Sequence, residues 1–251
     1  MACVGVLKVD GEALEYFYRK GRGQTIVFIP ALGFDWTYWG KSVGYFARKG
    51  YGVLALTLRG HSSSRTRLKA ISIGDHVMDV KLLLLKLGIT KPFFVGASLG
   101  GVVAAALHAG NKSIRCVCVN APVYFNREIR FSVRLLVFLL MPIVWLDWLT
   151  RPGWLRFDFS RSRLTNNVAM ALKGALKFNT YGFYLNYACL KNSRPLEFKG
   201  CITVSSRHDE VFRHVKKSDF IMDGNHNCAV SNSQGINAII DEILSKKSAK
   251  E

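Results

Sequence analysis

The stretch Gly96-Ala97-Ser98-Leu99-Gly100 constrains the fold of this chain more than any other. Before it, Phe93-Phe94-Val95 is apolar and aromatic, as in a buried strand, and residues 102–107 after it favour a helix. A turn this tight strains the serine backbone and brings strand and helix together, so glycine is needed on both sides. The Ser98 hydroxyl would then lie at the carboxyl end of the strand, beside free helix N–H groups that suit an oxyanion. The simpler alternative is a glycine-rich turn with an incidental serine.

Apolar strands alternate with helical patterns along the chain. This rhythm is typical of a mostly parallel, doubly wound α/β sheet, with ligands at the carboxyl ends of the strands. A hairpin over residues 5–19 turns at Asp10-Gly11. Expected strands cover residues 25–29, 52–58, 93–95, 114–119, 201–205 and 220–222, and expected helices cover 39–48, 72–87 and 234–247.

Residues 123–195 break this rhythm, because they contain no convincing strand and are helical, aromatic and basic. Eleven Lys or Arg residues stand against three acids there. We interpret this segment as a helical cap inserted into a core formed by residues 1–122 and 196–251. An apolar stripe at near-helical spacing predicts a pocket wall over the site; its members are Phe131, Leu135, Phe138, Leu139, Ile143 and Leu146. The alternative is a lid that meets anionic lipid, with Arg127, Arg130 and Arg134 on headgroups.

The net charge of +18, from 35 basic and 17 acidic residues, attracts anionic substrates, membrane surfaces or nucleic acid. No nucleic-acid recognition motif accompanies it. The apolar run 135–146 contains Pro142 and is shorter than the about 20 residues that a bilayer requires. The start of the chain shows no signal-peptide pattern, and the six cysteines show no paired metal spacing. We therefore expect a reduced, cytoplasmic setting, no metal or cofactor, and thiols at Cys116 and Cys118 that pack as small apolar groups.

A serine nucleophile needs a base, and the base needs a carboxylate that orients it. Asp209 follows the expected strand 201–205, and His226 follows the expected strand 220–222. The order Ser98, Asp209, His226, each beyond the end of a strand, lets one sheet bring the three groups together. Weaker alternatives stay open. Glu210 is a substitute acid, His208 and His214 are weaker bases, and His61, His76 and His108 are the remaining histidines.

These motifs resemble, in order over nearly the whole chain, those of the α/β-hydrolase fold superfamily, in particular its serine esterase, lipase and thioesterase branch. The stretch Leu58-Arg59-Gly60-His61-Ser62-Ser63-Ser64 is similar to the family's Asp-Leu-Arg-Gly-His-Gly-x-Ser, with Thr57 and Ser62 replacing its acid and second glycine. The resemblance implies that Ser98 is the nucleophile, His226 the base and Asp209 its acid. It also implies an oxyanion hole from the backbone N–H groups of Leu32 and Leu99.

Two features bear on that resemblance. The family usually has His-Gly at the oxyanion loop, where this chain has Pro30-Ala31, so the loop loses its internal support but keeps a backbone donor. Epoxide hydrolases and haloalkane dehalogenases of the superfamily carry aspartate at the elbow, and Ser98 argues against both. For Arg59, which follows a buried strand, a structural role is favoured over an anion contact with substrate.

The sequence thus predicts a cofactor-free serine hydrolase of carboxylic esters or thioesters, acting on small molecules with apolar acyl or aromatic groups. The same triad would also suit an acyltransferase or a carbon–carbon bond hydrolase. A non-enzymatic alternative is a hydrolase-like binding protein whose altered oxyanion loop does not support turnover. The oligomeric state is left open by the sequence.

Overall fold

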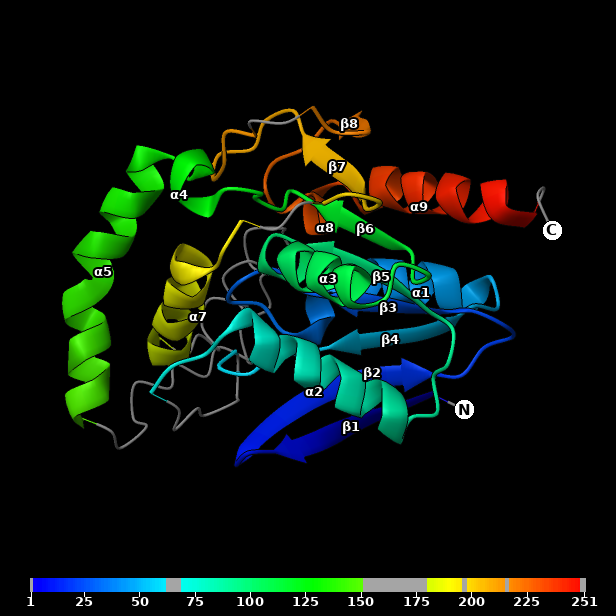
Figure 1. The fold of residues 1–251 in the computed structure, drawn as a ribbon, viewed down its shortest axis with the longest axis horizontal. Coiled ribbons are helices and arrows are strands. Elements are labelled where there is room, and N and C mark those ends of the chain that lie inside the picture. The colour runs from blue at the N-terminus through cyan, green and yellow to red at the C-terminus, as the bar shows by residue number, and fades with distance from the viewer. Residues whose placement is uncertain (1, 62–68, 151–179, 196–197, 215–216, 249–251) are drawn as a thin grey trace, which may run out of the picture.

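In the described part of the computed structural model of this chain, eight strands form one sheet in the order β1-β2-β4-β3-β5-β6-β7-β8 (Figure 1). The structure describes residues 2–61, 69–150, 180–195, 198–214 and 217–248. The mostly parallel sheet that the sequence predicts is confirmed. Its strands are β1 Ala2–Val9, β2 Glu12–Arg19, β3 Thr25–Ile29, β4 Gly52–Leu56, β5 Pro92–Ala97, β6 Cys116–Val119, β7 Ile202–Ser206 and β8 Phe220–Met222.

The first two strands form the predicted hairpin. Asp10 and Gly11 both have positive φ at its turn, the conformation that two-residue hairpin turns require. β1 and β2 pair antiparallel, β2 continues antiparallel to β4, and every other neighbouring pair is parallel. The carboxyl ends of the parallel strands therefore meet at one edge of the sheet, where the candidate residues are expected.

Helices cover both faces of the sheet. Alternation along β5 explains why both faces are apolar: Phe94 belongs to the core on one face, and Phe93 and Val95 belong to the core on the other. Helices α2 Ile73–Lys86 and α3 Leu99–Gly110 pack on the first face. The other face is covered by the short 3-10 helix η1 Trp36–Trp39 and by α1 Gly40–Arg48, α8 Cys228–Ser231 and α9 Ser233–Ser248.

Among the described residues, three further helices come from the expected cap. They are α4 Phe125–Glu128, α5 Phe131–Thr150 and α7 Thr180–Asn192, and α5 and α7 stand beyond the carboxyl ends of the parallel strands (Figure 1). Residues 151–179 of this segment lie outside the described residues, so its division from the core stays a prediction.

Asn186 of α7 fastens the cap to the core through a buried set of hydrogen bonds. Its side-chain Nδ2 donates to the carbonyl of Arg59 at 3.0 Å, and its Oδ1 accepts from His76 Nε2 of α2 at 2.7 Å. Gly182 also lies against the carbonyl of Gly60 so closely that a Cβ there would be 1.9 Å from the oxygen. The cap helix α7 is therefore seated directly on the loop after β4.

The side chain of Arg59 is structural, as the sequence favours, but its partner is a carboxylate. Its guanidinium donates through Nε and Nη2 to both oxygens of Asp79 on α2, and both side chains are buried. Asp10 adds a longer contact of 3.5 Å to Nη2. Ser62, Ser63 and Ser64 of the same motif lie outside the described residues.

The apolar stripe on α5 does not form the predicted wall where its side chains are described. Phe131 is 76% exposed and Phe138 is 71% exposed, and Leu135 and Leu139 are exposed as well. Ile143 and Leu146 lie in the part of α5 whose side chains are not described. Since apolar residues occur on all sides of this helix, burying one face leaves others exposed. No helix among the described residues is both long and apolar enough to cross a membrane.

Candidate active site

Ser98 lies at the sharp turn between β5 and α3 that the sequence predicts. Its φ of 51° and ψ of −115° lie in a strained region for a residue with a side chain. The strain is held by backbone hydrogen bonds: Ser98 N donates to Val119 O at 2.8 Å, and Val102 N donates to Ser98 O at 3.1 Å. A buried serine is thereby presented at the carboxyl end of a central strand.

The two glycines of the motif are required by close backbone contacts. A Cβ at Gly96 would lie 2.0 Å from the carbonyl oxygen of Gly100. A Cβ at Gly100 would in turn lie 2.4 Å from the carbonyl oxygen of Ile29. The first contact closes the strand against the helix, and the second brings the loop after β3 over the first turn of α3. Both contacts exclude any larger residue without a shift of the backbone.

Asp209 and His226 come together as the order of the motifs predicts. His226 Nδ1 lies 3.1 Å from each carboxylate oxygen of Asp209, and both residues are buried. Asp209 also accepts hydrogen bonds from the backbone N–H groups of Val211 at 2.8 Å and Phe212 at 3.0 Å. These contacts orient the carboxylate toward the imidazole ring.

The ionisation of Asp209 follows from these contacts. Burial raises the pKa of this carboxyl group. Hydrogen bonds from His214 and His226 lower it by more than burial raises it, so the pKa lies well below its usual range. The residue is therefore a carboxylate at neutral pH, which is the form that accepts a proton-bearing Nδ1.

The structure separates Asp209 from the rival acid. Glu210 Oε2 accepts a hydrogen bond from the backbone N–H of His226 at 2.9 Å instead of contacting its ring. The carboxylate at position 210 thus contacts the backbone of His226, and the carboxylate at position 209 contacts its imidazole ring.

Among the rival histidines, His214 has a contact that the sequence does not predict. Its Nε2 lies 2.8 Å from Asp209 Oδ2, and its Nδ1 lies 3.8 Å from Oε2 of the buried Glu128. Asp209 thus lies between two imidazoles. His208, on the same loop, has an exposed side chain and a backbone N–H that donates to Gly224 O.

Glu128 ties the loop after β7 that carries Asp209 to the start of the cap. Its Oε1 accepts from the backbone N–H groups of Val123 and Tyr124, and its carbonyl accepts from Arg213 N at 2.7 Å. Ile129 forms a single antiparallel bridge with Phe212. The segment that carries Asp209 is therefore bound on one side by the first residues of the cap.

Asn120, at the end of β6, joins three parts of the site. Its Nδ2 donates to Ser206 Oγ at 2.8 Å and to the carbonyl of His226 at 2.9 Å, and its Oδ1 accepts from Ser206 N. With φ of 46°, it adopts a left-handed conformation that asparagine tolerates better than most residues. The sequence indicates only that a strand stops here, because the partners of this amide are about a hundred residues away.

The loop after β3, which holds the predicted oxyanion donor Leu32, lies against the amino end of α3. Leu99 is the first residue of that helix, so its N–H has no partner inside the helix. Leu32 follows the loop residues whose carbonyls lie against Gly100, and Gly33 turns the chain with φ of 87°. The two backbone donors thus come from segments that contact each other. Neither N–H donates to another described residue.

The nucleophile candidate is not hydrogen-bonded to the base candidate. Within the described residues, no hydrogen bond joins Ser98 Oγ to His226. Such contacts are often long before substrate binds. Hydroxyl, imidazole and carboxylate are the three groups that nucleophilic acyl transfer uses. The structure pairs the last two directly and holds the first at the carboxyl end of the same sheet.

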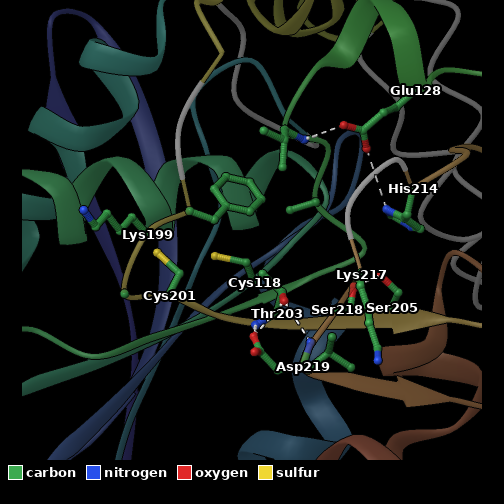
Figure 2. A pocket seen from close by; sticks show the side chains of 15 residues that line it. Cys118, Glu128, Lys199, Cys201, Thr203, Ser205, His214, Lys217, Ser218 and Asp219 are labelled. Atoms are coloured by element: carbon green, nitrogen blue, oxygen red, sulfur yellow. Dashed lines mark hydrogen bonds and ion pairs between the residues drawn. The ribbon is translucent and has the colours of Figure 1, made fainter.

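A cavity of about 520 Å³ is lined by residues of β6, β7 and the start of the cap, among them Cys118, Thr203 and Glu128 (Figure 2). His214 and Glu128 stand at one end of it, and Cys118 and Cys201 stand at the other. Neither Ser98 nor His226 lines it. Of the residues described above, it is lined by His214, which contacts Asp209, and by Glu128.

Comparisons with known proteins agree with this fold. The sequence model of the Alpha/beta hydrolase family matches residues 26–219. The fold is similar to that of a hydrolase from Pseudomonas aeruginosa PA01, with a TM-score of 0.73, 17% identity, and coverage of 96% of this chain and 98% of that one. It is also similar to the enol-lactonase from Burkholderia xenovorans LB400, with a TM-score of 0.73, 20% identity and coverage of 96% and 99%.

A curated relative is the dihydrolipoyllysine-residue acetyltransferase component of an acetoin cleaving system from Cupriavidus necator. The two are 32% identical over 119 residues, which make up 47% of this chain and 32% of the relative. The chain therefore spans about a third of the length of the curated relative that it matches.

Proposed function

Since this chain belongs to the alpha/beta hydrolase family, we propose that it is a serine hydrolase that cleaves carboxylic esters or thioesters through an acyl-enzyme. Ser98 is the nucleophile, His226 the base, and Asp209 the carboxylate that orients the base. The observation that carries the proposal is the contact of His226 Nδ1 with both oxygens of Asp209 at 3.1 Å. It leaves Nε2 as the ring nitrogen that exchanges a proton with Ser98.

In the first half of the reaction, Ser98 Oγ attacks the acyl carbonyl carbon and its proton passes to His226 Nε2. The carbonyl oxygen becomes an oxyanion, which the N–H groups of Leu99 and Leu32 stabilise. The carbon–oxygen or carbon–sulfur bond to the leaving group then breaks. The departing alkoxide or thiolate takes the proton from His226, and the acyl group stays on Ser98.

Water completes the cycle. It gives a proton to His226 Nε2 while its oxygen attacks the acyl-enzyme carbonyl, and collapse of the second intermediate releases the acid and returns the proton to Ser98 Oγ. Asp209 keeps its charge throughout and stabilises the imidazolium that forms twice in each turnover. Its strongly lowered pKa suits this role, because the carboxylate is never the proton acceptor.

We infer apolar acyl or aromatic substrates from the aromatic packing beside His226. The ring of Phe212 packs edge-on against the His226 ring with centroids 5.2 Å apart, and Phe125 of α4 packs against Phe212 at 5.8 Å. Burial of apolar area, and not charge pairing, would then supply most of the binding energy. A panel of p-nitrophenyl esters of graded chain length tests this. We expect kcat/KM to rise from acetate toward medium-length chains, and a preference for acetate would contradict it.

Acyl transfer to an acceptor other than water is the second candidate. The curated relative from Cupriavidus necator is an acetyltransferase component by name. Transfer would use the same acyl-enzyme, with a thiol or alcohol attacking in place of water. Adding a soluble thiol during ester turnover and measuring the ratio of thioester to free acid separates the two. A hydrolase yields mainly the acid, and a non-catalytic binding protein yields neither.

The exposed apolar side chains of α5 suit an anionic lipid surface. Phe131, Leu136 and Phe138 are exposed, and the cations Arg127 and Arg134 stand near the start of this helix. Apolar side chains that enter the interface beside cations on headgroups are the usual arrangement for such contact. Sedimentation with phosphatidylglycerol vesicles at low salt should carry the protein down, and phosphatidylcholine vesicles or 1 M salt should release it. Absence of binding to the anionic vesicles at low salt would contradict the lipid role.

A further inference from the structure

Three cysteine thiols that the sequence does not group lie together in the core. The Sγ atoms of Cys116, Cys118 and Cys201 all lie within 4.8 Å of one another, and all three residues are buried. Sequence spacing gives no sign of this, because Cys201 is more than eighty positions away from the other two. All six cysteines are free thiols.

The sheet register explains why they meet. Cys116 and Cys118 are two residues apart on β6, so their side chains point to the same face. β7 pairs in parallel with β6, with Ile202 opposite Val117, which places Cys201 at the amino end of β7 beside the other two thiols. On that face, the Cys118 thiol donates a hydrogen bond to the carbonyl of Gly101 in α3 at 3.3 Å. The cluster therefore sits between two neighbouring strands and the helix that covers them.

The cluster is not sealed. Cys118 and Cys201 line the cavity of about 520 Å³, and the exposed Lys199 lines it beside them (Figure 2). A small ion could thus reach two of the three sulfur atoms without passing through the core.

We propose that Cys116, Cys118 and Cys201 form a binding site for a thiophilic d10 cation of the Zn²⁺ class, with the open side of the site facing the cavity. Thiolates are the preferred soft ligands of such ions. Zinc–sulfur bonds of about 2.3 Å place tetrahedral sulfur ligands about 3.8 Å apart, so the thiols need to draw in by about 1 Å at most. The bound ion would cross-link β6 and the start of β7 beneath α3.

This site lies at the amino end of β7, whereas Asp209 follows its carboxyl end. The ion would therefore stabilise the fold without taking part in ester chemistry. The competing explanation is that three thiols pack there only as small apolar groups. Metal content separates the two explanations, because packed thiols hold no ion.

The test uses the full chain, kept reduced, with one equivalent of Zn²⁺ in the presence of a weak chelator. After gel filtration, the wild-type chain should retain about one zinc ion, measured by elemental analysis, and its Tm should rise. Cys118→Ser keeps a hydroxyl donor for the Gly101 carbonyl but loses a soft ligand, so zinc affinity should fall at least tenfold. Cys189→Ser is the matched control, since it also replaces a buried thiol but lies outside the cluster, on α7. It should bind zinc like the wild type.

A second measurement needs no variant to fold. Titration of the wild-type chain with Cd²⁺ should produce the ultraviolet charge-transfer absorption of cadmium thiolates, saturating at about one equivalent. A folded wild-type chain that retains no zinc and shows no such absorption overturns the proposal. Equal zinc retention by a folded Cys118→Ser variant overturns it as well. Neither result depends on whether Ser98 is a nucleophile, so the two proposals fail separately.

Discussion

His214 donates a hydrogen bond from Nε2 to Asp209 Oδ2 at 2.8 Å, so the carboxylate that contacts the His226 ring is also bound to a second imidazole. On its other side, His214 Nδ1 faces the buried carboxylate of Glu128 at 3.8 Å. His214 therefore stands between the candidate acid and the first turn of the cap. We infer that it is a positioning residue, which would act on the candidate base only through Asp209.

His214→Phe keeps a ring in this position but removes the donor to Asp209. A hydrogen bond to a charged group contributes about 1.5–3 kcal/mol, so we expect kcat to fall about ten- to hundredfold. KM should change little, because His214 lies behind the acid. His214→Gln retains an N–H donor and should recover most of the rate. Steady-state kinetics on a p-nitrophenyl ester measure both variants.

The matched control for this pair is His208→Gln on the same loop, where the side chain is exposed. It should leave kcat unchanged. If His214→Phe lowered only the Tm, with kcat per folded molecule intact, His214 would be a packing residue and the positioning role would be wrong.

Asp209→Asn should lower kcat about 10³–10⁴-fold, because an amide cannot hold the Nδ1–H tautomer of His226. Glu210→Gln should lower it only a few-fold, since the amide oxygen still accepts the backbone N–H of His226. The ratio of the two kcat values, measured at neutral pH with Tm recorded for both, gives the test. The reverse ranking would move the acid by one residue.

The stability of the fold should depend on two buried histidines outside the site. Burial lowers the pKa of His61 to about 3 and that of His76 to about 4, from about 6.5 in the unfolded chain. Above pH 6.5 these rings are neutral in both the folded and the unfolded chain. As pH falls from about 6.5, only the unfolded chain takes up protons at these rings, so the free energy of unfolding falls. The contribution of His76 to this fall ends near pH 4, and that of His61 ends near pH 3.

Each of these histidines contributes a slope of about 1.4 kcal/mol per pH unit within its window. Urea unfolding between pH 7 and pH 4.5 measures the slope. His76→Gln keeps an N–H donor for Asn186 but does not titrate, so its slope should be smaller by about that amount. Identical slopes in wild type and variant would show that His76 is protonated in the folded chain.

Local patterns predict the central part of the fold well. The elbow around Ser98, the hairpin turn at Asp10-Gly11 and the buried strand β5 each depend on neighbours in the sequence, and all appear in the structure. The helix over Ser72 to Leu87 is also bounded as expected, because Ser72 and Asp75 form a capping box at its start. In these cases the residues that determine the element lie within it or next to it in the sequence.

Contacts between distant segments are what the sequence misses. The contacts of His214, Asn120 and the Cys201 thiol form only when β6, β7 and the cap are placed side by side. The predicted pocket wall on α5 is wrong for a related reason. Helical spacing shows which apolar residues share a face, but not whether a partner covers that face. For the described part of the stripe, the side chains of Phe131 and Phe138 are exposed.

The most direct test of the proposed function is covalent labelling of the serine. A fluorophosphonate probe should label the wild-type chain, with the modified peptide carrying Ser98, because only an activated serine reacts with it at a useful rate. Ser98→Ala should remain folded by circular dichroism and Tm, take up no label, and lose about 10⁴-fold or more in ester hydrolysis. Labelling at another residue, or full activity in folded Ser98→Ala, would contradict the assignment of Ser98 as nucleophile.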